Sequence, residues 1–306
     1  METISPNNLS IRWKKYLELC KPKVVLLIIF TAVVGMLLST QGMLAWQTVI
    51  FATLGIGLAA ASGAAINQLV ERRIDAVMER TKSRPLPQGD LDEKKALIFA
   101  LSIGVIAILI LLFFVNLLTA ILTFISLIGY AVIYTIFLKR STSQNIVLGG
   151  AAGAAPPLLG WTAMTGEIQS EALLLFLIIF VWTPPHFWAL AIRRREEYAK
   201  VGIPMLPVTH GVPFTKLQIL LYTILLVAVT ILPFVIQMSG LIYLAGAIAL
   251  GIGFLRYAIA LYLADDSDVL AMKTFGYSIF YLNLLFMFFL ADHYARIFIR
   301  TFFLGS

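Results

Sequence analysis

Three oxygen-bearing side chains recur at intervals of four residues: Asn67, Glu71 and Asp75. On an α-helix, residues four apart lie on the same face, so this spacing predicts a polar stripe along one side of a helix. Carboxylate and amide oxygens are ligands for hard cations, and protein-bound Mg²⁺ usually keeps waters or phosphate oxygens as well. The stripe is therefore a candidate site for a magnesium ion that also contacts a phosphorylated substrate.

Basic side chains lie beside and just after the stripe, at Arg72, Arg73, Arg80, Lys82 and Arg84. Guanidinium groups bind phosphate oxygens in pairs and lysine adds a point charge, so this combination suits a diphosphate. The competing interpretation is a solvated helix end with ordinary charge pairs. We favour the functional one because Asn67 and Glu71 lie at the edge of an apolar run, where burying polar groups is costly unless they are paired or functional.

A second charged cluster reads RRREE at 193–197. If it faces the first cluster across a helical bundle, Glu196 or Glu197 could complete a second metal site. Taken alone the cluster is weak evidence, because most charge runs are solvated surfaces. Its significance comes from matching the first cluster.

A histidine, His186, follows Pro184 and Pro185 inside an apolar segment. It could ligate iron, bind a carboxylate or shuttle a proton. Alternatively, it could simply bond to a backbone carbonyl that the prolines free. The residues themselves leave these interpretations evenly balanced.

Aromatic residues make up 12% of the chain. Ring faces could stabilise a carbocation within a greasy tunnel, although ordinary packing explains most of them. Tyr130 and Tyr134, close to the basic loop at 139–145, are the preferred candidates.

The elements that carry these residues are predicted to be membrane helices. The chain has 306 residues, is 60% hydrophobic and only 13% charged, and its mean hydropathy is +0.92. Soluble domains carry about 25% charged residues, so a water-facing surface is excluded. We expect an all-α polytopic transmembrane bundle forming a single domain over 1–306, with about nine spans of about 20 residues each. The expected spans are 24–44, 46–66, 95–115, 117–138, 146–165, 171–192, 216–238, 240–263 and 274–293. The fifth, rich in Gly, Ala and Pro, should be kinked and packed closely against its neighbours.

Charge distribution predicts the orientation of the bundle. Of the 23 Lys and Arg residues, 20 lie in the N-terminal lead-in (1–23) and in alternate connections, while the intervening short connections have none. The positive-inside bias places the lead-in and the charged connections in the cytoplasm and the C-terminus on the opposite side. The net charge of +7 is explained by this bias and by anionic lipid headgroups rather than by nucleic acid. A single cysteine, Cys20, excludes an internal disulfide.

Taken together, the motifs resemble the UbiA-type intramembrane prenyltransferases over essentially the whole chain. The family's N-x-x-x-[DE]-x-x-x-D motif corresponds to Asn67, Glu71 and Asp75, and its M-x-R-T-x-x-R-P motif to residues 78–85. Four segments resemble the branch of the family that acts on haem: GGAAGAAPPLLGW (149–161), WTPPHFWALAIRR (182–194), GIPMLPVTHG (202–211) and KTFGYSIFYL (273–282). The chain departs from the family at Glu197, where an Asp is usual, so the geometry of that carboxylate stays open.

The resemblance implies transfer of a farnesyl group from farnesyl diphosphate to a vinyl carbon of haem b, with addition of water, to give haem O. It implies a Mg²⁺ cofactor, a bacterial cytoplasmic (inner) membrane location, and a terminal oxidase or haem A synthase downstream. The implied catalytic and metal-binding residues are Asn67, Glu71 and Asp75, with Glu197 as a further ligand. The implied diphosphate-binding residues are Arg80, Lys82, Arg84, Lys139, Arg193 and Lys273. The implied acceptor-binding residues are His186, Trp188 and Tyr134.

Three alternatives remain. A UbiA-type enzyme with an aromatic quinone-precursor or chlorin acceptor would share the metal site and differ only in the acceptor motifs. A transporter or proton pathway would spread polar residues through the membrane depth, whereas the third, fourth and seventh expected spans have almost none near their middle. A membrane phosphotransferase acting on lipid headgroups would carry an Asp-Gly-x-x-Ala-Arg pattern, which this sequence lacks.

Overall fold

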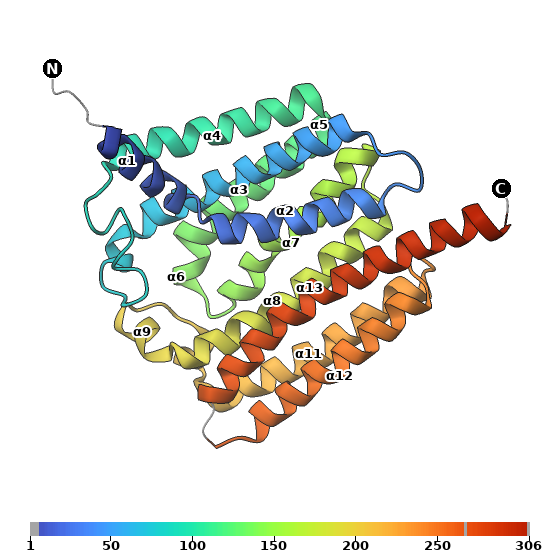
Figure 1. Cartoon of the computed structure of the whole chain (residues 1–306). Helices are drawn as coiled ribbons and strands as arrows, with labels where there is room; N and C mark the ends of the chain where they lie inside the picture. The colour runs from blue at the N-terminus through green and yellow to red at the C-terminus, as the bar shows by residue number, and fades with distance from the viewer. Residues whose placement is uncertain (1–5, 266–267, 305–306) are drawn as a thin grey trace.

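The computed structural model describes residues 6–265 and 268–304, and within these residues every regular element is helical (Figure 1). The long helices are α2 (Pro22–Leu38), α3 (Trp46–Asp75), α4 (Glu93–Phe114), α7 (Asn145–Thr165), α8 (Ser170–Arg193), α11 (Gly211–Val235), α12 (Leu241–Leu263) and α13 (Asp268–Ile299). Another long segment joins α5 (Leu117–Ile128), the π-helical η1 (Gly129–Leu138) and α6 (Lys139–Ser141). The remaining elements are α1 (Pro6–Leu19), α9 (Arg195–Lys200), α10 (Leu206–Thr209) and η2 (Arg300–Leu304).

The predicted membrane bundle is confirmed. In the described residues, eight helices are long and apolar enough to cross a membrane. Helices α1 and α2, bent by 54° at their junction, pass the same test as a pair, which gives up to nine spans. Helix α3 extends further than the expected span 46–66, because the polar residues that follow are mostly good helix formers. The polar stripe therefore lies on the last turns of a membrane helix rather than in a loop.

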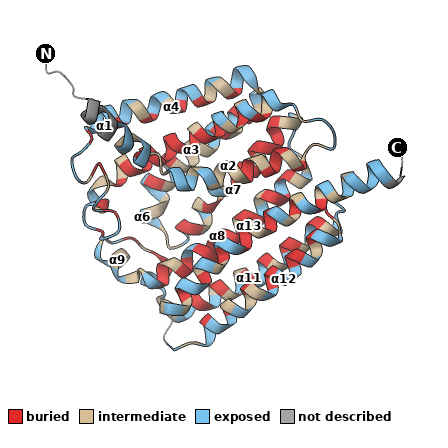
Figure 2. Cartoon of the chain, in the orientation of Figure 1, coloured by how far each residue is buried: buried red, intermediate tan, exposed pale blue. Residues whose placement is uncertain are grey.

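Helix α4 illustrates how the bundle meets lipid. Its large side chains, such as Val105 and Phe113, are exposed, whereas Ala100 and Gly104 are buried against α3. Ser62 of α3 donates a hydrogen bond across this contact to the Ala100 carbonyl over 2.8 Å. Because lipid is as apolar as leucine, membrane helices associate through small residues and close backbone packing rather than through large apolar side chains. Figure 2 shows the same division, with buried residues facing inward and exposed residues on the outer faces.

Helix α7 packs against α2 at two glycines. A Cβ atom on Gly160 would overlap the carbonyl oxygen of Ala32, and one on Gly35 would overlap that of Pro157. The close packing predicted for 146–165 is therefore confirmed. This contact holds α7 in the middle of the bundle, where it also packs against α8 and η1.

The charged connections gather at one end of the bundle. Figure 1 shows the α3–α4 connection, α6, α9 and the start of α13 at that end, while the short connections and the C-terminus lie at the other. The alternation seen in the sequence thus gathers the charged connections at one end of the bundle, called the polar end here, and the polar stripe at the end of α3 lies there.

Candidate active site

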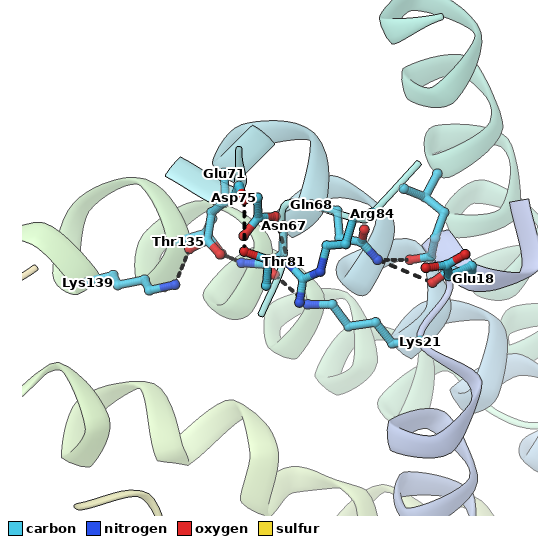
Figure 3. A network of polar contacts seen from close by, with 11 residues as sticks. Glu18, Lys21, Asn67, Gln68, Glu71, Asp75, Thr81, Arg84, Thr135 and Lys139 are labelled. Carbon is cyan, nitrogen blue, oxygen red and sulfur yellow. Dashed lines mark hydrogen bonds and ion pairs between the residues drawn. The ribbon is translucent and has the colours of Figure 1, made fainter. Parts of the chain in front are cut away.

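The polar stripe is buried at the end of α3. Asn67, Glu71 and Asp75 are 3%, 6% and 3% exposed, and their spacing of four places them along one face of the helix. Burying two carboxylates is strongly unfavourable unless each is paired and hydrogen-bonded. The surroundings of the stripe supply these partners from three other segments of the chain (Figure 3).

Asn67 is contacted from two sides. The ammonium group of Lys21 donates a hydrogen bond to Asn67 Oδ1 across 2.6 Å, and Asn67 Nδ2 donates to Thr135 Oγ1 across 3.3 Å. Lys21 sits at the break between α1 and α2 in a left-handed conformation, with φ of 51°. Sequence reasoning counted Lys21 only as a basic residue of the lead-in and missed Thr135 altogether.

The two carboxylates each pair with a cation. Glu71 forms an ion pair with Lys139, and Arg84 Nη1 lies 2.6 Å from Asp75 Oδ2. The backbone carbonyl of Asp75 also accepts a hydrogen bond from Thr81 Oγ1 over 3.1 Å, which folds the following turns back onto the helix end. The predicted diphosphate-binding residues Arg84 and Lys139 are therefore brought directly to the stripe.

The π-helical stretch η1 positions one wall of the site. Its wider turns leave the Tyr130 carbonyl to accept a hydrogen bond from Thr135 Oγ1, five residues on, over 2.8 Å. The same stretch ends beside Lys139, so it carries both the Thr135 and the Lys139 contacts to α3. Stretches of π-helix inside α-helices are frequently found at functional sites, and the sequence offers no clear signal for them.

The opposite wall is anchored by Gln68. Its Nε2 donates to the backbone carbonyls of Glu18 and Leu19, at 3.3 and 3.0 Å, and so ties the end of α1 to α3. This anchor fixes the α1–α2 break over the stripe and explains why Lys21 reaches it.

Arg80 and Lys82 lie in the turns after α3. Lys82 forms an exposed ion pair with Glu79 at 2.7 Å. Partial desolvation and the neighbouring charge of Arg84 lower the pKa of Arg80. The charge of Arg194 on the second cluster lowers this pKa as well, so Arg194 is also near Arg80. Arg80 thus stands between the stripe and the second charged cluster.

Arg193 and Lys273 lie in a different basic group. They line an open pocket of about 510 Å³ with Asp268 and Met272, and Arg193 Nη1 lies 3.2 Å from Asp268 Oδ2. Of the six residues predicted to bind the diphosphate, two therefore lie at the stripe, two in the turns after α3, and two at this pocket at the ends of α8 and α13.

Glu197 lies on α9 and lines another pocket, of about 320 Å³, together with Arg193, Arg194 and Met272. Its nearest cation is Arg194, at 3.7 Å, and the buried Oε2 atom has no hydrogen-bond partner among the described residues. Glu196 is exposed. In the described part of the chain no three His, Cys, Asp or Glu side chains converge, so Glu197 is not in direct contact with Glu71 and Asp75.

The donor set fits magnesium. The stripe presents an amide oxygen and two carboxylates, all hard oxygen ligands, and Glu197 adds a buried carboxylate oxygen that has no hydrogen-bond partner among the described residues and lies 3.7 Å from Arg194. Mg²⁺ is commonly bound by one or two carboxylates together with substrate phosphates and water. Asn67, Glu71 and Asp75 are the residues that would hold it, with Glu197 as the further candidate.

His186 does not bond to a carbonyl freed by the prolines. It is buried, and its Nδ1 lies 2.7 Å from Ser278 Oγ on α13. The imidazole stacks between Trp182 and Phe275, with ring centroids 4.2 and 4.5 Å away. The alternative in which a freed backbone carbonyl accepts a hydrogen bond from His186 is therefore wrong. The partner is a serine hydroxyl 92 residues away in the sequence.

The other two acceptor candidates lie apart from His186. Trp188 is 1% exposed and packs edge-on against Tyr222 in the core between α8 and α11. Tyr134 lies on η1, stacked on Tyr130 with centroids 5.8 Å apart. Their roles stay predictions from the sequence.

Comparisons with known proteins place the chain among relatives. The UbiA prenyltransferase family matches residues 28–287. The chain is 66% identical to the protoheme IX farnesyltransferase of Thioalkalivibrio sulfidiphilus over 93% of its own length and 94% of that protein. It is 59% identical to the protoheme IX farnesyltransferase of Legionella pneumophila strain Paris, over 96% of its length and 100% of that protein.

Solved structures share the fold at low identity. A structure of digeranylgeranylglyceryl phosphate synthase has a TM-score of 0.78 and 21% identity, covering 92% of this chain and 98% of that one. A UbiA homologue from Archaeoglobus fulgidus bound to GPP and Mg²⁺ has a TM-score of 0.63 and 15% identity, covering 91% of this chain and 99% of that one. These likenesses establish the arrangement of helices.

Proposed function

The chain belongs to the UbiA prenyltransferase family, and on this premise we propose that it transfers a farnesyl group from farnesyl diphosphate to a vinyl group of haem b. Water adds in the same reaction, so the products are haem O and diphosphate. The observation that carries the proposal is the buried stripe of Asn67, Glu71 and Asp75, with one cation on each residue. The haem acceptor is supported by the names and full-length similarity of the bacterial relatives.

Magnesium is proposed as the cofactor, held by the stripe and supported by the archaeal homologue that binds GPP and Mg²⁺. When bound, the ion supplies positive charge that makes diphosphate a better leaving group. Glu197 is the proposed additional ligand because its buried Oε2 accepts no hydrogen bond from the described residues and has only a 3.7 Å ion pair with Arg194 there.

Lysine and arginine side chains of the chain supply further positive charge at the site. Lys21, Lys139 and Arg84 already point at the stripe, so they can contact a diphosphate placed there without large movement. Charge that builds on the leaving oxygen is then met by groups fixed in advance, which is the usual largest contribution of an enzyme site. Arg80 extends this basic surface toward α9.

The bond between the farnesyl carbon and the diphosphate oxygen breaks to leave an allylic cation. The electron pair of the vinyl group forms the new carbon–carbon bond, water adds to the vinyl carbon beside the porphyrin ring, and a proton is released. The apolar bundle keeps bulk water from the cation. Ring faces such as those of Tyr130 and Tyr134 on η1 are proposed to stabilise it.

We place the protein in a bacterial cytoplasmic membrane with the polar end inside, because basic connections favour the cytoplasmic side. Haem O would pass to a terminal oxidase or to a haem A synthase.

The test is a turnover assay with purified protein, haem b, farnesyl diphosphate and Mg²⁺. Chromatography and mass spectrometry should find a pigment heavier than haem b by a farnesyl group plus water. An Asp75→Asn variant and a chelator-treated sample should lack it. Diphosphate release with unchanged haem would replace the acceptor with another aromatic or chlorin molecule. Neither product nor release from folded protein would favour the transporter alternative.

A further inference from the structure

Two aromatic rings cover both faces of the His186 imidazole. Trp182 stacks at 4.2 Å with an interplanar angle of 19°, and Phe275 at 4.5 Å with an angle of 25°. Trp182 comes from α8, like His186, and Phe275 from α13. A third ring, that of Phe187, lies perpendicular to the imidazole with centroids 4.9 Å apart. A partner can therefore approach the imidazole only within the ring plane, along the part of the edge that Phe187 leaves open. This is the direction in which a nitrogen lone pair binds a metal.

The hydrogen bonds of Ser278 identify which ring nitrogen carries the proton. Ser278 Oγ lies 2.6 Å from the Phe275 carbonyl oxygen and 2.7 Å from His186 Nδ1. A serine hydroxyl has one hydrogen, and a carbonyl oxygen cannot donate. The hydroxyl therefore donates to Phe275, and both short contacts are satisfied when Nδ1–H donates to Ser278. In the neutral ring, Nε2 then carries the free lone pair.

Nε2 has no hydrogen-bond partner in the part of the chain that the structure describes. Metal-binding histidines commonly donate their other ring N–H to a neighbouring acceptor, which sets the tautomer and the ring orientation. The Ser278 contact has this form.

A second hydrogen bond between α8 and α13 fixes the position of His186. Trp182 Nε1 donates a hydrogen bond to the Ser278 backbone carbonyl across 2.9 Å. Trp182 and His186 are four residues apart on α8, so one turn of α8 docks twice on a single residue of α13. An apolar packing contact would need neither bond. The arrangement instead determines the position and the tautomer of the imidazole.

We propose that Ser278 is a positioning residue that holds His186 as the Nδ1–H tautomer, and that His186 Nε2 coordinates the iron of haem b during the reaction. This inference rests on the proposed function, because it takes haem as the acceptor. His186 lies seven residues before the end of α8, about 10 Å from the polar end at 1.5 Å per residue. The iron is thereby held within the apolar depth of the bundle.

The experiment is a haem b titration of the purified full chain without farnesyl diphosphate, followed by resonance Raman spectroscopy of the ferrous complex. The wild type should show an iron–histidine stretching band. His186→Ala should lose the band, and added imidazole should restore it. Ser278→Ala should shift the band to lower frequency, since imidazole loses its hydrogen-bond acceptor, and raise the Kd for haem about 10-fold.

Two variants separate positioning from loss of structure. Ser278→Thr keeps the hydroxyl and should retain the wild-type band. Thr274→Val removes a buried hydroxyl one turn earlier on α13. Among the described residues this hydroxyl bonds only to the Leu270 carbonyl, at 2.8 Å, so the variant should also leave the band unchanged. A frequency shift of the band in the Thr274→Val protein as large as that in Ser278→Ala would overturn the specific role of Ser278.

The outcomes also distinguish this inference from the proposed function. A wild-type complex without the band that still makes haem O would overturn only the His186–iron contact. A wild-type complex with the band that makes no haem O would sustain the contact and overturn the proposed reaction. Absence of haem binding would overturn both, and an unchanged band in Ser278→Ala would reject the positioning role.

Discussion

The ammonium group of Lys21 lies 2.6 Å from the amide oxygen of Asn67, and so joins the α1–α2 break to the first residue of the stripe. The bend of 54° at this break makes the contact possible. Gln68 holds the same corner by bonding to the carbonyls of Glu18 and Leu19. The segment before the first full span is thus a wall of the candidate active site.

Replacing Lys21 with methionine should lower the rate of farnesyl transfer about 100-fold, because one fixed charge that faces the diphosphate is lost. The matched control is Lys23→Met, since Lys23 is exposed and only two residues away. Rates of product formation under saturating substrates would compare the two proteins. Equal rates for both variants would remove Lys21 from the site.

Removing the metal should stop the reaction without unfolding the protein. Glu71 and Asp75 keep Lys139 and Arg84 as partners, so chelation leaves neither carboxylate as an unpaired buried charge. Activity should return when Mg²⁺ is added, and the thermal unfolding temperature should change little. A large drop in that temperature on chelation would show that the metal, rather than these ion pairs, stabilises the stripe.

Arg84→Met should be destabilising where chelation is not. It leaves the buried Asp75 carboxylate without its cation, and breaking a buried pair from one side costs about 3–5 kcal/mol of unfolding free energy. Double replacement with Asp75→Asn should recover part of this loss, because no unpaired charge is left behind. Unfolding curves of the two variants in the same detergent would provide the comparison.

The two basic groups should differ in their effect on the diphosphate substrate. Arg84 contacts the stripe, whereas Lys273 lines the pocket beside Arg193 and Asp268. We expect Lys273→Met to leave the KM for farnesyl diphosphate near the wild-type value and Arg84→Lys, which keeps the charge but loses the fork, to raise it. Comparable rises for both would support the sequence-based assignment of Lys273 to diphosphate binding.

Gly160→Ala should destabilise the bundle by about 1–3 kcal/mol, the usual cost of overfilling a packed contact. The added methyl group would overlap the Ala32 carbonyl, which belongs to the backbone of α2 and cannot rotate away. Gly153→Ala on the same helix is the control, since a Cβ there meets nothing within 4 Å. Equal thermal stability of both variants would contradict the close α2–α7 contact.

Hydropathy and residue spacing were sufficient to predict the membrane helices and the helix face that carries the stripe. Long apolar runs predicted the membrane helices, since a bilayer allows few other backbone structures. The spacing of Asn67, Glu71 and Asp75 predicted one helix face, because 3.6 residues make a turn. Arg84 follows the stripe so closely that its approach to Asp75 was also within reach of sequence reasoning. These are local properties, which depend on residues near one another in the chain.

Only the tertiary structure decided which distant groups complete the site. Lys21 reaches Asn67 across 46 residues, and His186 meets Ser278 across 92. It also decided that Lys139 joins the stripe while Lys273 lies in a separate pocket, although both are lysines at the polar end. Such contacts depend on helix bends, on the π-helical stretch and on which small residues allow helices to approach. These are properties of packing, which no spacing within a single helix determines.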